Sequence, residues 1–367
     1  MNRRNWAALV CAAAGMPLCN AQPAGVTLSG VIDAGVRRDS GGIGRVNSLG
    51  SGLSQTSRLT FFGVEDLGDG LKASFALESG LNVDTGTGTS NPPAAPPLQG
   101  LTFGRTAAVA LGSERHGFLS LGRQYTPLFA VSAGGINDPF GANWLGGVST
   151  VYSLTARASN AVAYSWGYSA RAMLGGAPRS GFGAAVMYGF SEESDPATRG
   201  AGRQWGFNLS WANGRWFMGY GYHEVRGNNP TINAVARTAL TPVTRQQTLA
   251  LSYEFGFGRL HLGLNRGSDG LALDRLNWHV GASLPLGDRH ILRILYGRAD
   301  DRFTTDADFS TWQIGYQYNL SRRTSLYAAW GQVNNSANSR ATLAGALGSY
   351  HNGATARSTI AGFRHVF

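Results

Sequence analysis

The chain has 367 residues, of which 52 are glycine and only 14% are charged, and its formal net charge is +10. Its 31 basic residues include a single lysine, Lys72, and are scattered along the chain without a basic helix, which argues against a nucleic-acid partner. After residue 21 there is no run of 18 apolar residues and no Pro- or Ser-rich linker. We therefore expect one domain, residues 22–367, without transmembrane helices.

The first residues have the three parts of a secretory signal peptide. "MNRR" supplies a positive start, "WAALVCAAAGMPL" an apolar run and "CNA" at 19–21 a small-residue cleavage site, so residues 1–21 are predicted to be removed on export. A membrane anchor is the less favoured alternative because the run falls short of the roughly 20 apolar residues that a span needs. A lipoprotein site at Cys19 is disfavoured by the bulky residues before it. Cys11 and Cys19 are the two cysteines of the chain, so the predicted domain can form no disulfide.

Alternation of apolar and polar residues dominates the rest of the chain. In the segment 70–80, Leu71, Phe75 and Leu77 fall on one face of a predicted strand. Lys72 and Glu78 fall on the other face. Sixteen such segments of about ten residues, the length with which a tilted strand crosses a bilayer, are predicted at 26–37, 57–66, 70–80, 103–112, 117–125, 157–168, 181–190, 203–212, 215–226, 244–255, 259–267, 275–285, 289–298, 309–320, 324–333 and 357–367.

The predicted strands are joined by short and long connections in turn. The short ones lie at 67–70, 112–117, 212–215, 255–258, 285–288 and 320–323, and the long polar ones at 38–56, 82–100, 126–156, 191–202, 227–243 and 334–356. An even strand count with this rhythm is typical of a bacterial outer-membrane barrel, with short periplasmic turns and long external loops. Because backbone groups in lipid must all be paired internally, a β-protein spans a membrane only as a closed sheet. The sequence therefore predicts an all-β, 16-stranded antiparallel transmembrane β-barrel.

Aromatic residues gather near the ends of the predicted strands. Such positions match the aromatic girdles at the two membrane interfaces, whereas the alternative is that these rings pack a soluble core. The residues are Trp205, Trp211, Trp216, Tyr220, Tyr222, Tyr296, Trp312, Tyr316, Tyr318, Tyr327 and Trp330.

Several stretches together resemble the Gram-negative general porins of the neisserial and Burkholderia type. They are "VTLSGVIDAGV" (26–36), "SRLTFFGVEDLGDGLKASFALESGLNVDTG" (57–86), "FGRTAAVALGSERHGFLSLGRQYTPLF" (103–129), "YNLSRRTSLYAAWGQVNN" (318–335) and the closing "GFRHVF" (362–367). The resemblance implies a homotrimeric outer-membrane channel for small hydrophilic solutes whose third external loop, here about 126–156, folds inward. Asp138-Pro139-Phe140-Gly141 stands where the family often has a Pro-Glu-Phe-Gly-like stretch, so the acidic residue is kept but precedes the proline.

A pore needs charge of a chosen sign at its narrowest point rather than a catalyst. Alternation places Asp33, Arg37, Arg58, Lys72 and Glu78 on the inward faces of the first three strands. The resemblance implies basic wall residues opposite an acidic inward loop. On that basis the basic role is assigned to Arg58, Lys72, Arg105 and Arg123, and the acidic role to Asp138.

Each of these assignments has an alternative. Arg105 and Arg123 share parity with Val109 and Leu121, which would point them to lipid unless they lie beyond the hydrocarbon band or a bulge intervenes. Arg58 and Lys72 would serve equally as lumen charges away from the constriction. Asp138 could cap a turn before Pro139. Asp33 and Glu78 could pair with neighbouring arginines in the wall.

The excess of arginine, which stays charged at any working pH, favours a weak anion preference. The histidines lack metal-ligand spacing such as His-Glu-x-x-His and no Gly-x-Ser-x-Gly elbow occurs, so no enzyme, metal or cofactor is expected. Two alternatives stay open: a substrate-specific porin for phosphate or a carboxylate, and a barrel adhesin or hydrolase with a blocked lumen.

The segment 357–367 is predicted to close the barrel against the first strand. Thr359, Ala361, Phe363, His365 and Phe367 share one face of it, which would place the Phe367 ring at the periplasmic interface. The resemblance implies that Gly362, Phe363, His365 and Phe367 form the signal read by the barrel-assembly machinery. It also implies contact with outer-membrane lipid and lipopolysaccharide.

Overall fold

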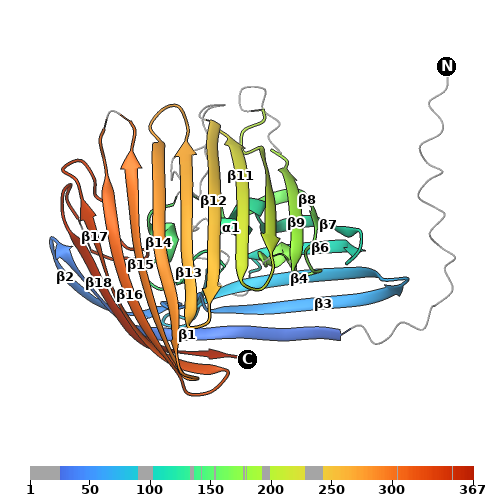
Figure 1. Cartoon of the computed structure of the whole chain (residues 1–367), viewed down its shortest axis with the longest axis horizontal. Coiled ribbons are helices and arrows are strands. Elements are labelled where there is room, and N and C mark those ends of the chain that lie inside the picture. Colours follow the sequence, from blue (N-terminus) through green and yellow to red (C-terminus); the bar gives the residue numbers. More distant parts are fainter. Residues whose placement is uncertain are drawn as a thin grey trace.

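The computed structural model describes residues 25–367 except 90–101, 133–135, 142, 153, 177, 179, 192–198, 228–242, 304 and 349. The predicted signal peptide, residues 1–21, lies outside the described residues. The described chain forms 18 strands in one closed antiparallel sheet, and Figure 1 shows the strands following one another around the barrel wall.

The strands are β1 (Gly25–Gly42), β2 (Gly44–Ser51), β3 (Arg58–Gly68), β4 (Leu71–Asn82), β5 (Thr87–Thr89), β6 (Thr106–Ser113), β7 (Gly117–Tyr125), β8 (Arg157–Trp166), β9 (Gly181–Gly189), β10 (Gln204–Ala212), β11 (Trp216–Arg226), β12 (Val243–Phe255), β13 (Gly258–Ser268), β14 (Asp274–Leu286), β15 (His290–Asp301), β16 (Phe309–Asn319), β17 (Thr324–Asn335) and β18 (Ala356–Val366). The helices are short: α1 (Pro127–Ser132) and two 3₁₀ turns, η1 (Gly147–Thr150) and η2 (Ala172–Leu174). In the described part of the chain, no helix has the length and apolarity to cross a membrane.

Two positions in the barrel wall are each occupied by two strands in succession. One edge of β1 pairs with β3 through residues 25–31 and with β2 through residues 34–42. In the same way β4 pairs with β6 through residues 72–78 and with β5 through residues 80–82. The 18 strands therefore fill 16 positions, and the predicted 16-stranded antiparallel barrel is confirmed.

The sheet closes where β1 meets β18. The two strands pair antiparallel from Val31 opposite Val366 to Ser40 opposite Arg357. Beyond the last paired residues, the backbone N–H and C=O of Gly30 bond to those of Phe367, at 3.0 and 3.1 Å. No edge is left along this seam, as a sheet surrounded by lipid requires.

Side chains along the strands alternate between an exposed outer face and a buried inner face. Leu249 is 55% exposed while its neighbour Ala250 is 1% exposed, and Ile314 is 43% exposed beside Gln313 at 1%. Soluble proteins rarely expose so many large apolar side chains, whereas the outer face of a membrane barrel is apolar because it contacts lipid. The apolar outer face is therefore the lipid-facing band.

The described residues of the β7–β8 loop (126–156) lie inside the barrel. Its side chains Trp144, Leu145 and Val148 are buried against the inner faces of β15 to β18. Polar contacts fasten its second half to the wall: the Gln313 amide bonds Gly147 N–H and C=O at 3.1 and 3.2 Å, and the Gln246 side chain accepts the N–H of Thr155 at 2.8 Å.

The structure differs from the sequence prediction in two connections. β2 lies in the predicted loop 38–56, and β5 in the predicted loop 82–100. β2 is exposed or half-buried along its whole length and so lacks the apolar face that marks a membrane strand, while β5 is too short to show a period. The β8–β9 turn (residues 167–180), which the sequence assigned to neither the short nor the long connections, carries η2.

Candidate pore constriction

A polar cavity of about 580 Å³ lies in the lumen between the wall at β3 to β8 and the β7–β8 loop. Five arginines and two carboxylates line it, together with aromatic and small polar side chains. The charged residues are Arg58, Arg105, Arg157, Arg293, Arg364, Glu78 and Asp138.

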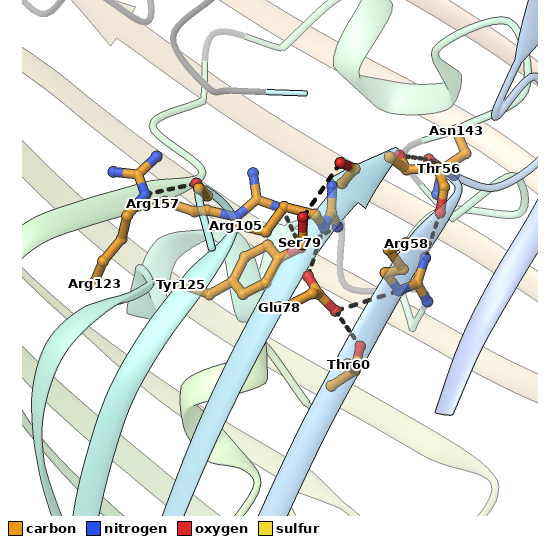
Figure 2. A network of polar contacts seen from close by, with 12 residues as sticks. Thr56, Arg58, Thr60, Glu78, Ser79, Arg105, Arg123, Tyr125, Asn143 and Arg157 are labelled. Carbon is orange, nitrogen blue, oxygen red and sulfur yellow. Dashed lines mark hydrogen bonds and ion pairs between the residues drawn. The ribbon is translucent and has the colours of Figure 1, made fainter. Parts of the chain in front are cut away.

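Glu78 forms the centre of the charged network (Figure 2). Its Oε1 lies 2.6 Å from Nε of Arg105, and its Oε2 lies 3.2 Å from Nε of Arg58. The Thr60 hydroxyl also donates to Oε2, at 3.2 Å. The sheet register brings these groups together, since Thr60 is directly opposite Glu78 and Arg58 opposite Gly80 on the facing strands β3 and β4. One carboxylate therefore holds two guanidinium groups in fixed orientation.

Tyr125 extends the network across the end of β7. Its hydroxyl accepts a hydrogen bond from Nη2 of Arg105 at 2.7 Å and another from Nη2 of Arg157. The Arg157 guanidinium also lies 4.1 Å from the centre of the Tyr125 ring, which stacks on Phe129 at 4.9 Å. Stacking on an aromatic face and a bond to its hydroxyl hold a guanidinium in place without neutralising it. Figure 2 shows Arg157, Tyr125, Arg105, Glu78 and Arg58 in one row along the wall.

Arg293 and Arg364 come from β15 and β18, outside that row. The Nε of Arg293 donates to the carbonyl of Pro139 at 2.9 Å, and its guanidinium lies 5.3 Å from the Trp144 ring. With these two residues the lining carries five positive and two negative side chains. In a narrow space with low-dielectric walls such an excess concentrates ions of the opposite sign.

Asp138 lines the cavity and also shapes the loop that carries it. Its Oδ1 accepts the N–H of Phe140 at 2.9 Å and its Oδ2 the N–H of Val148 at 3.1 Å. Burial, together with the nearby Asp138 carboxylate, raises the pKa of the Tyr152 hydroxyl above its ordinary value. Tyr152 therefore stays protonated and contacts Nδ1 of His279 at 2.7 Å, which ties the loop to β14.

A second inward segment, residues 52–57 between β2 and β3, is held by Asp33. The Asp33 carboxylate, fully buried, accepts the N–H groups of Ser54 and Gln55 at 3.2 and 2.9 Å and the Tyr327 hydroxyl at 2.6 Å. Thr56 then meets the β7–β8 loop, since its N–H and hydroxyl both donate to Oδ1 of Asn143.

This arrangement fixes the position of Arg58. Its Nη1 donates to the carbonyl of Thr56 at 2.9 Å while its Nε faces Glu78. Figure 2 shows both contacts. Asp33 thus acts on the cavity through the backbone of segment 52–57, without lining the cavity itself.

A model of the Gram-negative porins matches residues 6–338 of the chain. The chain belongs to this family. Outer membrane porin protein 32 of Delftia acidovorans is 30% identical to this porin over 348 residues, which are 89% of this chain and 88% of that protein. An outer membrane porin protein of Bordetella pertussis is 29% identical over 329 residues, 78% of this chain and 79% of that protein. Among solved structures, the anion-selective porin from Comamonas acidovorans has a TM-score of 0.76 and 26% identity, covering 94% of this chain and all (100%) of that chain. The chain is thus an outer-membrane porin, a channel through its own barrel.

The porin's structure brings some of the sequence-predicted constriction residues together and separates others. Arg58, Glu78, Arg105 and Asp138 line the cavity. Arg105 directly precedes β6, so the parity of that strand does not govern its direction.

Four candidates lie elsewhere. Asp33 holds segment 52–57, and Arg37 is paired with Asp39 at 2.8 Å and bonds the β17–β18 loop through the carbonyl of Ala344. Lys72 lies at the periplasmic end of β4, 3.6 Å from Glu114. Arg123 bonds the Gly104 carbonyl and the Ser159 hydroxyl beside a bulge between β7 and β8.

Sequence reasoning missed Arg157, Arg293, Arg364 and Tyr125 of the porin lining. Arg364 was readable, because it alternates with Phe363 and His365, which were placed on the outer face. Arg293 was hidden by its surroundings: it shares the inner face of β15 with Leu295, which is buried under the β7–β8 loop. Arg157 and Tyr125 stand at strand ends, where alternation gives little information.

The predicted assembly residues lie on β18 and directly after it. Phe363 and Phe367 are 52% and 41% exposed and His365 is exposed, so these three side chains share the outer face. Gly362 lies on the other face, where the Tyr327 hydroxyl would come within 2.5 Å of an added Cβ. The glycine is therefore required by packing against β17.

Proposed function

We propose that this porin conducts small hydrophilic solutes and ions by passive diffusion with a preference for anions. The observation that carries the proposal is the lining of the cavity, in which five arginines face two carboxylates. The anion-selective porin from Comamonas acidovorans, 26% identical, supports it.

The geometry suggests how an anion would pass. Glu78 occupies one edge of Arg58 and of Arg105, and Tyr125 takes one N–H from Arg105 and one from Arg157. The remaining N–H groups of these side chains are available to replace part of the hydration shell of an anion. Arginine suits this role because its charge persists and its planar group can hold an oxyanion through two bonds.

The preference is tested by the reversal potential of the purified porin in a planar bilayer with a KCl gradient. A potential of the sign set by chloride flow supports the proposal, and a potential set by potassium flow overturns it. Single-channel steps in symmetric KCl serve as the control for an open lumen, since a blocked barrel adhesin or hydrolase would give no large steps.

A specific anion porin is the second candidate, favoured by the convergence of Arg58, Arg105 and Arg157 on one side of the cavity. Phosphate or a small dicarboxylate held by two guanidinium groups would bind more tightly than chloride. Conductance that saturates with millimolar phosphate but stays linear with chloride would favour this candidate.

The mature form and its partners complete the proposal. Cleavage after residue 21, assembly into homotrimers as in the porins that the chain resembles, contact with lipopolysaccharide, and reading of Gly362, Phe363, His365 and Phe367 by the barrel-assembly machinery are all inferred. Deleting Phe367 removes its two backbone bonds to Gly30 together with an exposed ring. We expect a lower yield of trimer in the outer membrane; Phe257→Ala, an exposed ring on a periplasmic turn, is the control. An unchanged yield after the deletion would contradict the assembly role.

A further inference from the structure

The described residues of the β8–β9 turn (167–180) fold into the barrel from the periplasmic end. Tyr168 is 2% exposed and its hydroxyl donates to Oδ1 of Asn208 at 3.0 Å. Ala170 and Met173 are also buried. The turn therefore leaves the rim of the barrel and returns along its inner wall.

The wall beneath this turn is apolar on its lumen side. Ala170 and Met173 pack against inward side chains of β3, β4, β6 and β7, namely Phe62, Ala76, Ala108, Ala110 and Phe118. Apolar side chains facing a water-filled lumen would cost free energy in proportion to their exposed area. The turn therefore covers this apolar patch, and the apolar residues of the wall are stable facing the lumen only because the turn shields them from water.

Arg171 lies between the buried Ala170 and Met173 of the turn and is itself exposed. Its guanidinium carbon lies 4.0 Å from the centre of the Phe62 ring. Phe62 shares the inward row of β3 with Arg58 and Thr60, four residues from Arg58, which is about 13 Å along a strand. The stacked guanidinium therefore continues the row of arginines from the constriction toward the periplasm.

The same turn reaches the constriction itself. Leu174 and Gly175 line the cavity together with Tyr125. A Cβ on Gly175, whose φ is +73°, would lie 2.9 Å from the Tyr125 ring, so only glycine allows the turn this close to the residue that orients Arg105 and Arg157.

We propose that the β8–β9 turn is a second selectivity element, which narrows the periplasmic half of the pathway through Leu174 and holds anions there through Arg171. The part played by Arg171 rests on the proposed anion preference; the narrowing by Leu174 does not. Because Arg171 lies on one side of the constriction, it makes the two directions of current unequal.

Arg171→Ala tests the anion site, with Arg171→Lys as the charge-conserving variant. Arg115→Ala is the matched control, an exposed arginine on the neighbouring periplasmic turn. Recorded in a KCl gradient and in symmetric KCl at both polarities, R171A is expected to move the reversal potential toward zero and to reduce the asymmetry of the current, R171K to restore most of both, and R115A to leave them as in the unaltered porin. Equal behaviour of R171A and R115A would overturn the anion site.

Leu174→Trp tests the narrowing separately. A larger ring at this position is expected to lower the single-channel conductance by roughly a quarter, because conductance depends on the open width at the narrowest stretch. Met187→Trp, in a buried position on β9 away from the cavity, is the control for folding. If L174W conducts as the unaltered porin does, the narrowing by Leu174 is overturned. Since this readout is independent of ion sign, a cation-preferring porin would refute the proposed anion preference and leave the narrowing in place.

Discussion

The two lumen walls of this porin are built on different principles. Between the β8–β9 turn and the external side, the wall at β3, β4 and β8 is polar and faces the cavity with Arg58, Glu78 and Arg157. The wall at β15 to β18 is dry over much of its height, with Leu295, Val333 and other apolar side chains buried under the β7–β8 loop. The first wall carries three of the five arginines that line the cavity, whereas the second contributes Arg293 and Arg364 and holds the loop that narrows the lumen. The width therefore depends mainly on the loop packed against the second wall, and most of the charge comes from the first.

The largest test of this division is Leu145→Ala in the β7–β8 loop. Leu145 is fully buried, and its side chain packs so closely on β17 that a Cβ at Gly331 would lie 2.8 Å from it. Truncation of a buried leucine costs about 2–5 kcal/mol, which we expect to see as a lower urea midpoint in detergent. Conductance should rise as the loop loosens, with little change in ion preference.

Met187→Ala is the matched control for this prediction. Met187 is as deeply buried but packs on alanines of β8 rather than on the loop. It should lose similar stability at unchanged conductance. A large change in ion preference for L145A would show that the two walls are not separate.

The second test, Glu78→Gln, changes the charged wall alone. It removes the carboxylate that Arg58 and Arg105 share and keeps its shape. Removing a unit negative charge at about 8 Å in water lowers the energy of chloride and raises that of potassium by roughly 0.5 kcal/mol each, so the chloride-to-potassium permeability ratio should rise about five-fold. Glu254→Gln, which unpairs Arg259 away from the cavity, should leave the ratio unchanged. A fall in the ratio for E78Q would contradict the role assigned to charge on this wall.

The smallest effect is expected from Asp33→Asn, which acts through segment 52–57. The carboxylate accepts bonds from Ser54, Gln55 and Tyr327, and losing part of this set costs about 1–3 kcal/mol. The permeability ratio should fall modestly as Arg58 loses its fixed position. Asp39→Asn changes a buried carboxylate of the same strand that bonds the β17–β18 loop, and should lower stability only. Equal chloride-to-potassium permeability ratios in the Asp33→Asn and Asp39→Asn variants would show that Asp33 does not position Arg58.

The barrel could be predicted from the sequence because lipid imposes one rule on the outside of every strand. β6 to β18 were each placed within a few residues, since apolar residues such as Val109 and Leu249 recur with period two. β2 was not found because it is exposed or half-buried throughout and lipid imposes no pattern there.

No single rule of this kind governs the side chains that face the lumen. Glu78 and Arg58 were found where the inner face is wet and alternation is clean. Arg293 was missed because the β7–β8 loop makes the inner face of β15 apolar as well. The inward β8–β9 turn was missed for the same reason, as Phe62 and Phe118 alone do not show what covers them. Charge at the constriction depends on pairing across strands, which spacing along one strand cannot reveal.

The seam between β1 and β18 has a consequence for how this porin comes into being. Val31 pairs with Val366, so the final ring closure joins the two ends of the described chain. Until that contact forms, both strands present open edges that would pair with any other extended chain. A contact of such sequence separation forms slowly. The chain therefore becomes a closed channel only when β1 meets β18, and until then its two edge strands need to be kept from pairing with other chains.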